Sequence, residues 1–179
     1  MTFVPAVSSP CSRSTLELAP GRYELRIGAA AGDRVGSVFL DLEISDFARA
    51  PFSTSGVMVV PVPRPGDASA RLEVASAARP SVRRTFGASD VVNVIWQLYQ
   101  RGADRVVPVT VAMTITDDHG GIVSTTDTAF GVAQFDVEKT ATWVSALPLK
   151  DLAAGEYLVT LKAMAGSRSE SANVRIRIQ

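Results

Sequence analysis

Apolar and polar residues alternate with a period of two along much of the chain. The alternation is longest from Val107 to Ile115, where every second residue is a large apolar one and Pro, Thr or Ala lies between. It recurs at 38–44 and 173–179. Because successive side chains of a strand point to opposite faces of a sheet, this period predicts half-buried β-strands.

One segment, VVNVIWQLYQ at 91–100, is apolar on both faces, which predicts a central strand covered on both sides. Further short strands are predicted in the segments STLEL, YELRIGA, VMVVPV, ARLEVA, IVSTTDT, TATWVSALPL and YLVTLKA. Turn clusters such as PRPGD, GASD, DDHGG and AAGD separate them, and no segment predicts a stable helix. The pattern predicts an all-β fold, an immunoglobulin-like or fibronectin III-like antiparallel β-sandwich.

Two parts of the chain share one pattern. The runs LAPGRYELRIGAAAG and LAAGEYLVTLKAMAG lie 134 residues apart, and ten of the 27 positions in 18–44 are identical to those in 152–178. Both contain L-x-x-G-x-Y, with a glycine that is free to take a positive φ before Tyr23 and before Tyr157. In an immunoglobulin-like sandwich, a tyrosine at the start of the penultimate strand bonds upstream backbone through its hydroxyl. Each copy is therefore predicted to be the last hairpin of a sandwich.

The position of the two copies predicts the domain organisation. Enough chain precedes the second copy for the other strands of a sandwich, whereas 17 residues precede the first. We predict a partial β-unit at 1–46, a linker at 47–56 and a complete sandwich at 57–179, with Phe47 and Phe52 filling the junction. A lone hairpin exposes unpaired edges, so residues 16–44 are expected to pack against the complete domain or to pair with another chain.

A family resemblance covers nearly the whole chain. The run GRYELRIGAAAGDRVGSVFLDLEISDFARAPFSTSGVMV resembles the region near the C-terminus of bacterial von Willebrand factor A-related proteins, where a strand pair ending G-S-V-x-x-D-L-x-V-x-D-F leads through a short linker to a final β-domain. The runs RRTFGASDVVNVIWQLYQ and LKDLAAGEY look like that final domain. The resemblance implies accessory β-modules exported as part of a longer protein. The D-x-S-x-S metal signature of the A domain does not occur in this sequence, so its metal and adhesion chemistry are not implied.

Composition narrows the partners and the compartment. The formal net charge is zero and 20% of residues are charged, so we expect neither nucleic acid nor an anionic membrane surface as a partner. No segment reaches the roughly 18 apolar residues of a membrane span. The single cysteine, Cys11, cannot form an internal disulfide. No signal peptide is visible, so the chain is expected to be cytosolic or a piece of a longer protein that is secreted or held at the cell surface.

Candidate chemistry centres on one turn. His119, the single histidine, lies in DDHGG, a predicted hairpin turn. Calcium needs about six or more oxygen ligands and zinc needs more His or Cys than the chain has. Neither the G-x-S-x-G elbow nor a phosphate-binding glycine motif occurs. We predict no catalytic, cofactor-binding or metal-binding residue, no cofactor and no enzyme activity. Whether Asp117 and Asp118 bind a cation, and whether an unrecognised pair of carboxylates acts on glycosides, stays open.

The leading hypothesis is a non-catalytic accessory module that acts in protein–protein interaction or structural spacing. Its partner would be another protein, a neighbouring domain of the same longer chain, or a second copy through residues 16–44. The alternative is a carbohydrate-binding or other ligand-binding module that uses exposed aromatic rings, above all Trp143 or Tyr99, with Phe130 as a further candidate. Trp96 is expected in the core, as in other immunoglobulin folds. Solvent exposure of these rings distinguishes the two hypotheses.

Overall fold

The computed structural model describes residues 16–62, 82–103 and 105–179. They form two compact units, one within residues 1–46 and the other within 47–179. The smaller unit contains two strands, β1 (Gly21–Ala31) and β2 (Arg34–Ile44). The larger unit contains β3 (Ser53–Thr54), β4 (Met58–Pro61), β5 (Thr85–Phe86), β6 (Val92–Tyr99), β7 (Val109–Asp117), β8 (Ile122–Phe130), β9 (Thr140–Ala146), β10 (Gly155–Ala165) and β11 (Arg168–Ile178), with two short 3₁₀ turns, η1 (Val132–Gln134) and η2 (Leu149–Asp151).

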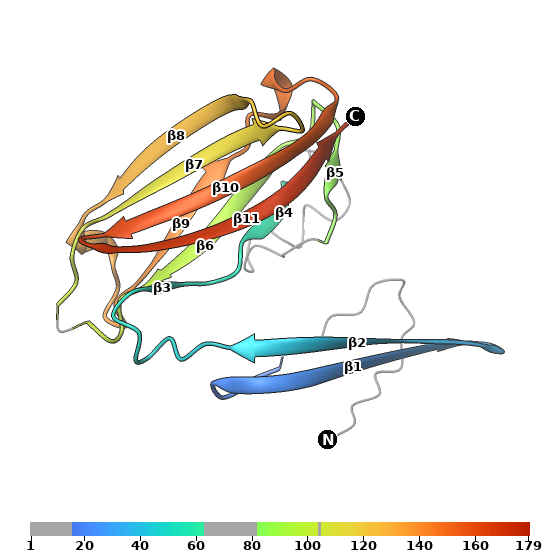
Figure 1. The fold of residues 1–179 in the computed structure, drawn as a ribbon, viewed down its shortest axis with the longest axis horizontal. Coiled ribbons are helices and arrows are strands. Elements are labelled where there is room, and N and C mark those ends of the chain that lie inside the picture. The colour runs from blue at the N-terminus through green and yellow to red at the C-terminus, as the bar shows by residue number, and fades with distance from the viewer. Residues whose placement is uncertain (1–15, 63–81, 104) are drawn as a thin grey trace. The chain divides into compact units, whose positions relative to one another are not determined.

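The larger unit is a β-sandwich of two sheets (Figure 1). One sheet has the order β5-β11-β10-β7-β8, in which all pairs are antiparallel except β5 with β11. In the other sheet β6 is central, with β3 and β4 along one edge and β9 along the other. The all-β, immunoglobulin-like sandwich predicted from the alternating pattern is confirmed.

The core of the larger unit lies between the inner faces of these two sheets. The segment at 91–100, with apolar residues on both faces, contains the central strand β6, as predicted, and its inward residues are buried. Across the core lie the alternating residues of β7 and β10, which are buried at every second position. The core residues of these three strands are Val92, Val94, Trp96, Leu98, Val109, Val111, Met113, Ile115, Tyr157, Val159, Leu161, Ala163 and Ala165.

The hairpins β1–β2 and β10–β11 have the same register. Gly21 pairs with Ile44 at the open end of the first, and Gly155 pairs with Ile178 at the same place in the second. Both close through a two-residue turn whose first residue is a glycine with positive φ, 62° and 61° respectively. A glycine there is typical of the type II′ turn, which matches the twist of antiparallel strands. The repeat in the sequence is therefore a repeat of one hairpin.

Both predicted tyrosine corners are present. The Tyr23 hydroxyl donates to the carbonyl of Ala19 at 2.9 Å, and the Tyr157 hydroxyl donates to the carbonyl of Ala153 at 3.0 Å. The expected positive φ of the preceding glycine occurs at Gly21 (153°) but not at Gly155. In an immunoglobulin-like sandwich this corner marks the start of the penultimate strand, and β10 has that position in the larger unit.

Some strand boundaries differ from the prediction. β7 begins at Val109 rather than Val107, because the side-chain amide of Gln100 bonds both the N–H and the carbonyl of Val107 (3.0 and 2.8 Å). These bonds take the place of ladder bonds at Val107. The described part of STLEL, residues 16–18, is not a strand. The segment ARLEVA lies outside the described residues.

Residues 47–56 do not form the predicted linker. They belong to the larger unit, where Ser53 and Thr54 pair with the end of β6 as strand β3. Phe52 is buried in the core of that unit, and the Phe47 ring packs on Tyr99 with centroids 4.9 Å apart. The small residues and the proline suggested a linker, but burial of Phe52 and backbone pairing with β6 stabilise an ordered path.

Candidate interaction surface

The β1–β2 hairpin presents one apolar face. Its cross-strand pairs are Tyr23 with Leu42, Leu25 with Leu40, and Ile27 with Val38. Directly opposed residues of an antiparallel pair point to the same side of the sheet, so these six side chains form one surface, the hairpin apolar face. Its members Ile27, Val38 and Leu40 are 51%, 54% and 50% exposed.

The second hairpin shows what normally covers such a face. Leu161 and Val174, which correspond to Ile27 and Leu40, are 0% and 9% exposed because the β6 sheet packs over them. Leu152, which corresponds to the exposed Leu18, is buried as well. The first hairpin thus has the side chains of a sandwich interior on a two-stranded sheet. Contiguous exposed apolar surface of this kind is characteristic of an interaction site.

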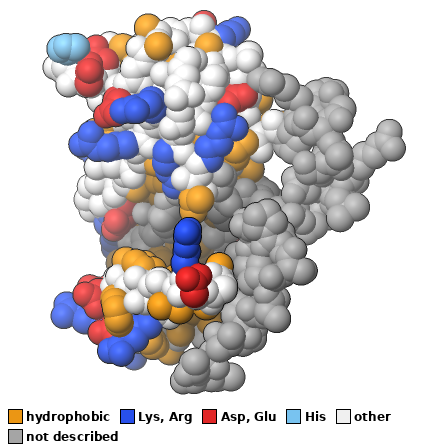
Figure 2. All heavy atoms as spheres, turned by 90° about the vertical axis from the view of Figure 1, so that its right-hand side faces the viewer, with side chains coloured by type: hydrophobic (Ala, Val, Ile, Leu, Met, Phe, Trp, Pro, Cys, Tyr) orange, Lys and Arg blue, Asp and Glu red, His pale blue; other side chains and the backbone are white. Residues whose placement is uncertain are grey.

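The opposite face of the hairpin is charged. Arg22 lies 3.7 Å from Glu43, Arg26 pairs with Glu24, and the Arg26 guanidinium lies 5.1 Å from the centre of the Phe39 ring. In Figure 2 hydrophobic side chains of the hairpin lie at the surface beside arginine and acidic side chains. Exposed ion pairs contribute little stability, so their main effect is to keep this face in solvent.

The ion pair between the two strands has opposite polarity in the two hairpins. Glu156 on β10 pairs with Arg177 on β11, at the positions that Arg22 and Glu43 occupy in the first hairpin. The position of the pair is kept while the charges are exchanged. Counting identical residues missed this correspondence, and a comparison of charges at the same offset would have found it.

The turn between β7 and β8 holds the acidic residues and the histidine considered from the sequence. Asp117 accepts two backbone N–H bonds through Oδ1, from His119 at 3.0 Å and from Gly121 at 2.7 Å. The Asp118 carboxylate lies 2.6 Å from His119 Nδ1, and both side chains are largely exposed. The ligand atoms of the three residues lie within 4.8 Å of one another. The turn is stabilised by the Asp117 side chain. The three side chains offer one ligand atom each, fewer than the six or more oxygens that calcium takes.

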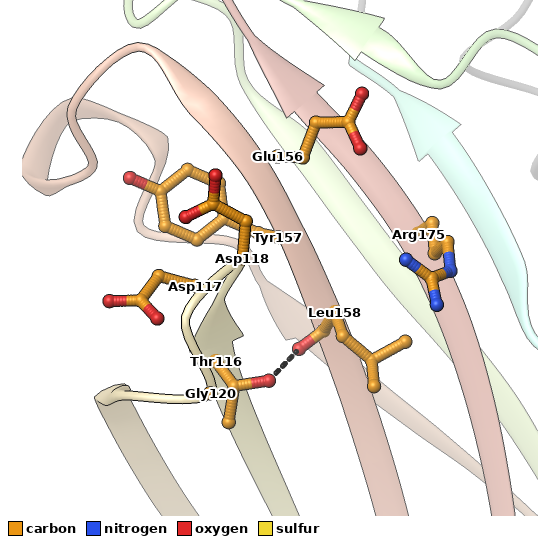
Figure 3. A pocket seen from close by; sticks show the side chains of 8 residues that line it. All are labelled: Thr116, Asp117, Asp118, Gly120, Glu156, Tyr157, Leu158 and Arg175. Carbon is orange, nitrogen blue, oxygen red and sulfur yellow. Dashed lines mark hydrogen bonds between the residues drawn. The ribbon is translucent and has the colours of Figure 1, made fainter.

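A surface depression of about 270 Å³ adjoins this turn (Figure 3). Asp117 and Asp118 reach it from the turn, while Glu156 and Arg175 stand on the outer side of β10 and β11. Each of its carboxylates already has a partner: backbone N–H groups for Asp117, His119 for Asp118 and Arg177 for Glu156. A glycosidase general acid needs a desolvated carboxyl group, whereas Asp118 and Glu156 are 64% and 54% exposed.

The aromatic residues of the alternative hypothesis do not form an open platform. Trp96, Trp143 and Phe130 are buried. Tyr99 is half-buried between the Phe47 ring and the Arg101 guanidinium, which lies 5.5 Å from its ring centre. Burial raises the pKa of Tyr99, and the charge of Arg101 acts weakly in the opposite direction. The rings of the alternative hypothesis are therefore part of the packing of the larger unit.

A pair of substitutions at Asp117 distinguishes a structural turn from a cation site. Asp117→Ala removes the acceptor of two backbone N–H groups and is expected to lower the free energy of unfolding by about 1–2 kcal/mol. Asp117→Asn keeps the Oδ1 acceptor and should retain most of it. Thermal unfolding of the unsubstituted chain and of both variants, with and without calcium at about a thousandfold excess over protein, provides the measurement. A calcium-dependent rise in Tm that Asn abolishes would mean that the carboxylate binds the ion.

Cys11 lies outside the described residues. Within the part of the chain that the structure describes, no helix has the length and apolar character of a membrane span. A further depression, of about 560 Å³, lies at the open end of the first hairpin and is lined by Arg22, Tyr23, Glu24, Asp41, Leu42 and Glu43.

Comparison with known proteins gives structural likeness only. No protein-family model matches the chain, and no curated protein sequence matches it. The C-terminal domain of Wzt superposes with a TM-score of 0.45 at 10% identity, over 87% of this chain and 78% of that one. An immunoglobulin-like protein from Pseudomonas aeruginosa superposes with a TM-score of 0.42 at 15% identity, over 74% of this chain and 99% of that one.

Another match is a segment of a much longer enzyme. A β-glucosidase from Erythrobacter marinus superposes with a TM-score of 0.42 at 12% identity, over 72% of this chain. The chain spans 15% of the length of that protein. We draw no function from these similarities, because divergent proteins that share a fold carry out many different functions.

Proposed function

We propose that the chain is a non-catalytic β-sandwich module of a larger, exported bacterial protein, and that it acts in protein–protein interaction through the β1–β2 hairpin. The larger unit supplies a stable body, and the hairpin supplies the contact surface. The resemblance to the C-terminal β-domains of von Willebrand factor A-related proteins supports this context, since an accessory module there joins or spaces other domains.

One observation carries the proposal. The hairpin apolar face consists of residues whose counterparts in β10–β11 are covered by a second sheet, and half of its members are at least 50% exposed. Burying apolar surface gains about 25 cal/mol for each Å² removed from water. A two-stranded sheet is marginal by itself in water, so a partner that covers this face stabilises the hairpin as it binds.

The chemistry of the described residues supports a binding role rather than a catalytic one. The acidic residues near the β7–β8 turn are solvated and paired, and His119 lies at an exposed turn. General acid–base catalysis requires a base within hydrogen-bond reach of a bound substrate in a site that excludes water. The depression beside the turn is lined by paired, solvated carboxylates, and the rings of Trp96, Trp143 and Phe130 are buried.

Site-specific photo-crosslinking in the cells that make the protein tests this function. A benzophenone amino acid replaces Ile27 in the hairpin apolar face, and the matched control replaces Val144 of β9, which is 52% exposed in the larger unit. We expect protein adducts from position 27 that are at least several-fold more abundant than those from position 144. Equal labelling at the two positions would contradict the proposal.

A further inference from the structure

The geometry points to a second copy of the chain as the partner of the hairpin, bound by antiparallel pairing of β1 with β1. The two copies would be related by a two-fold axis at Leu25, and the product is a four-stranded sheet with the order β2-β1-β1-β2. This inference rests on the proposed function, because it takes the hairpin as the contact surface and names what occupies its edge.

The outer edge of β1 pairs with none of the strands that the structure describes. In a hairpin closed by a two-residue turn, the residues beside the turn form a hydrogen-bonded pair, and such pairs alternate along the ladder. The pair beside this turn is Ala31 with Arg34, so the odd-numbered residues of β1 bond β2. The backbone groups of Glu24, Arg26 and Gly28 therefore point to the other edge. Among the described strands, only β2 pairs with β1.

The same edge is occupied in the second hairpin. β10 pairs along it with β7 in antiparallel orientation, through Leu158 with Thr116, Thr160 with Thr114 and Lys162 with Ala112. These β10 residues correspond to Glu24, Arg26 and Gly28. An antiparallel strand along this edge is therefore part of how this hairpin is built into a sheet. An unpaired row of backbone groups is a template for such a strand from another molecule.

The charges on β1 select a second copy and one register. With the axis at Leu25, Glu24 lies opposite the second copy's Arg26, and Arg26 lies opposite the second copy's Glu24. An axis at Glu24 or at Arg26 opposes like charges, which destabilises a strand pair. An axis at Tyr23 also opposes unlike charges, but it pairs five residues of each β1 rather than nine, since the strand begins at Gly21.

Charged residues often protect an edge strand from association, and their order decides whether they do so here. An edge that carries charges of one sign repels a copy of itself, because like charges meet in the pair. β1 carries Arg22, Glu24 and Arg26 in alternation, which is self-complementary about Leu25. β2 carries Asp41 and Glu43 on the same face, and self-pairing centred between them opposes two acids. The self-complementary edge is therefore that of β1 and not that of β2.

The pairing also joins the two apolar faces. In the same register Tyr23 lies opposite the second copy's Ile27, and the two Leu25 side chains meet at the axis. All of these belong to the hairpin apolar face, so the four-stranded sheet has one continuous apolar side. Sheets of three or more strands with an apolar face are stable where a lone hairpin is marginal.

Charge reversal with sedimentation or light-scattering analysis of the full 179-residue chain tests the inference. We expect a dimer that Glu24→Arg and Arg26→Glu each weaken by about tenfold or more, because each places two like-charged pairs across the axis. The double variant Glu24→Arg/Arg26→Glu should restore the dimer, and a mixture of the two single variants should form a heterodimer. Matched controls with the same change in net charge are Glu138→Arg and Arg168→Glu, which are exposed on the larger unit.

A disulfide gives an independent readout of the register. Leu25 meets its own copy as a non-hydrogen-bonded pair, whose Cα atoms lie about 4.5 Å apart, within the range that a disulfide bridges. In a Cys11→Ser background, Leu25→Cys should give a covalent dimer on mild oxidation. Ala29→Cys should not, because its two copies would lie eight residues apart along the strands, about 27 Å.

The outcomes separate this inference from the proposed function. A chain that stays monomeric at all concentrations, or a dimer that survives both single reversals, overturns the β1 pairing. Position-27 adducts to a different protein would then leave the proposed function standing with another partner. Failure of the double variant to restore the dimer while its larger unit melts normally also overturns the pairing. Absence of both dimer and adducts contradicts both proposals.

Discussion

Replacing Leu161 by alanine is expected to lower the free energy of unfolding of the larger unit by about 2–5 kcal/mol. Leu161 is 0% exposed and lies on β10 between the two sheets of the core. Its removal leaves a cavity lined by residues of well-packed strands, which relax only partly. Chemical denaturation followed by tryptophan fluorescence measures the loss, because Trp96 and Trp143 both lie in this core.

The matched control is Ile27→Ala, a truncation of similar size at the corresponding position of the first hairpin. Ile27 is half-exposed in the smaller unit, so denaturation of the larger unit should be unchanged within about 0.5 kcal/mol. If the two substitutions lowered the free energy of unfolding of the larger unit equally, Ile27 would be as buried as Leu161. That result would contradict the exposed apolar face on which the proposed function rests.

The second large effect is expected at the two tryptophans. They are directly opposed on β6 and β9, and both are buried. Replacing Trp96 by alanine should cost about 3–5 kcal/mol, as expected for a large aromatic side chain removed from a core. If the residue formed a sugar-binding platform, the same change would leave the free energy of unfolding nearly unchanged.

A substitution by phenylalanine separates the two indoles. Trp96 Nε1 donates to the carbonyl of Ser55 at 2.8 Å, whereas Trp143 Nε1 is buried without a partner among the described residues. Trp96→Phe removes this hydrogen bond and leaves the Ser55 carbonyl without its indole donor. Trp143→Phe removes only a donor that has no partner among the described residues. We expect Trp96→Phe to cost about 1–3 kcal/mol more than Trp143→Phe in parallel denaturation curves. Equal costs would show that the bond to Ser55 contributes nothing net.

Much of the larger unit follows from local pattern. The period of two predicted β7 and β11, and the segment apolar on both faces predicted the central strand β6. The tyrosine corners were predictable because the corner is built from residues four apart, Ala19 with Tyr23 and Ala153 with Tyr157. Period, turn residues and short-range bonds are all visible within a dozen residues of sequence.

The errors came from long-range pairing. Residues 47–56 resemble a linker in composition, but β3 pairs with the end of β6, about 45 residues later in the chain. β7 starts late because Gln100 bonds the backbone of Val107. Trp143 and Phe130, which were suggested as part of a sugar platform, are in the core, because their side chains face the other sheet. In each case the structure depends on a contact with a distant strand or with a side chain, and the composition or period of the segment itself does not show that contact.

The sequence by itself determined that this protein has two copies of one hairpin, since strand period, corner tyrosine and turn glycine act within the hairpin. Only the tertiary structure decided how differently the copies are used: β10–β11 is paired with β7 and β5 and covered by the β6 sheet, while β1–β2 carries the same kind of apolar face half-exposed. The physical reason is that burial depends on which distant strands pack against a residue, and two nearly identical local patterns can receive different neighbours.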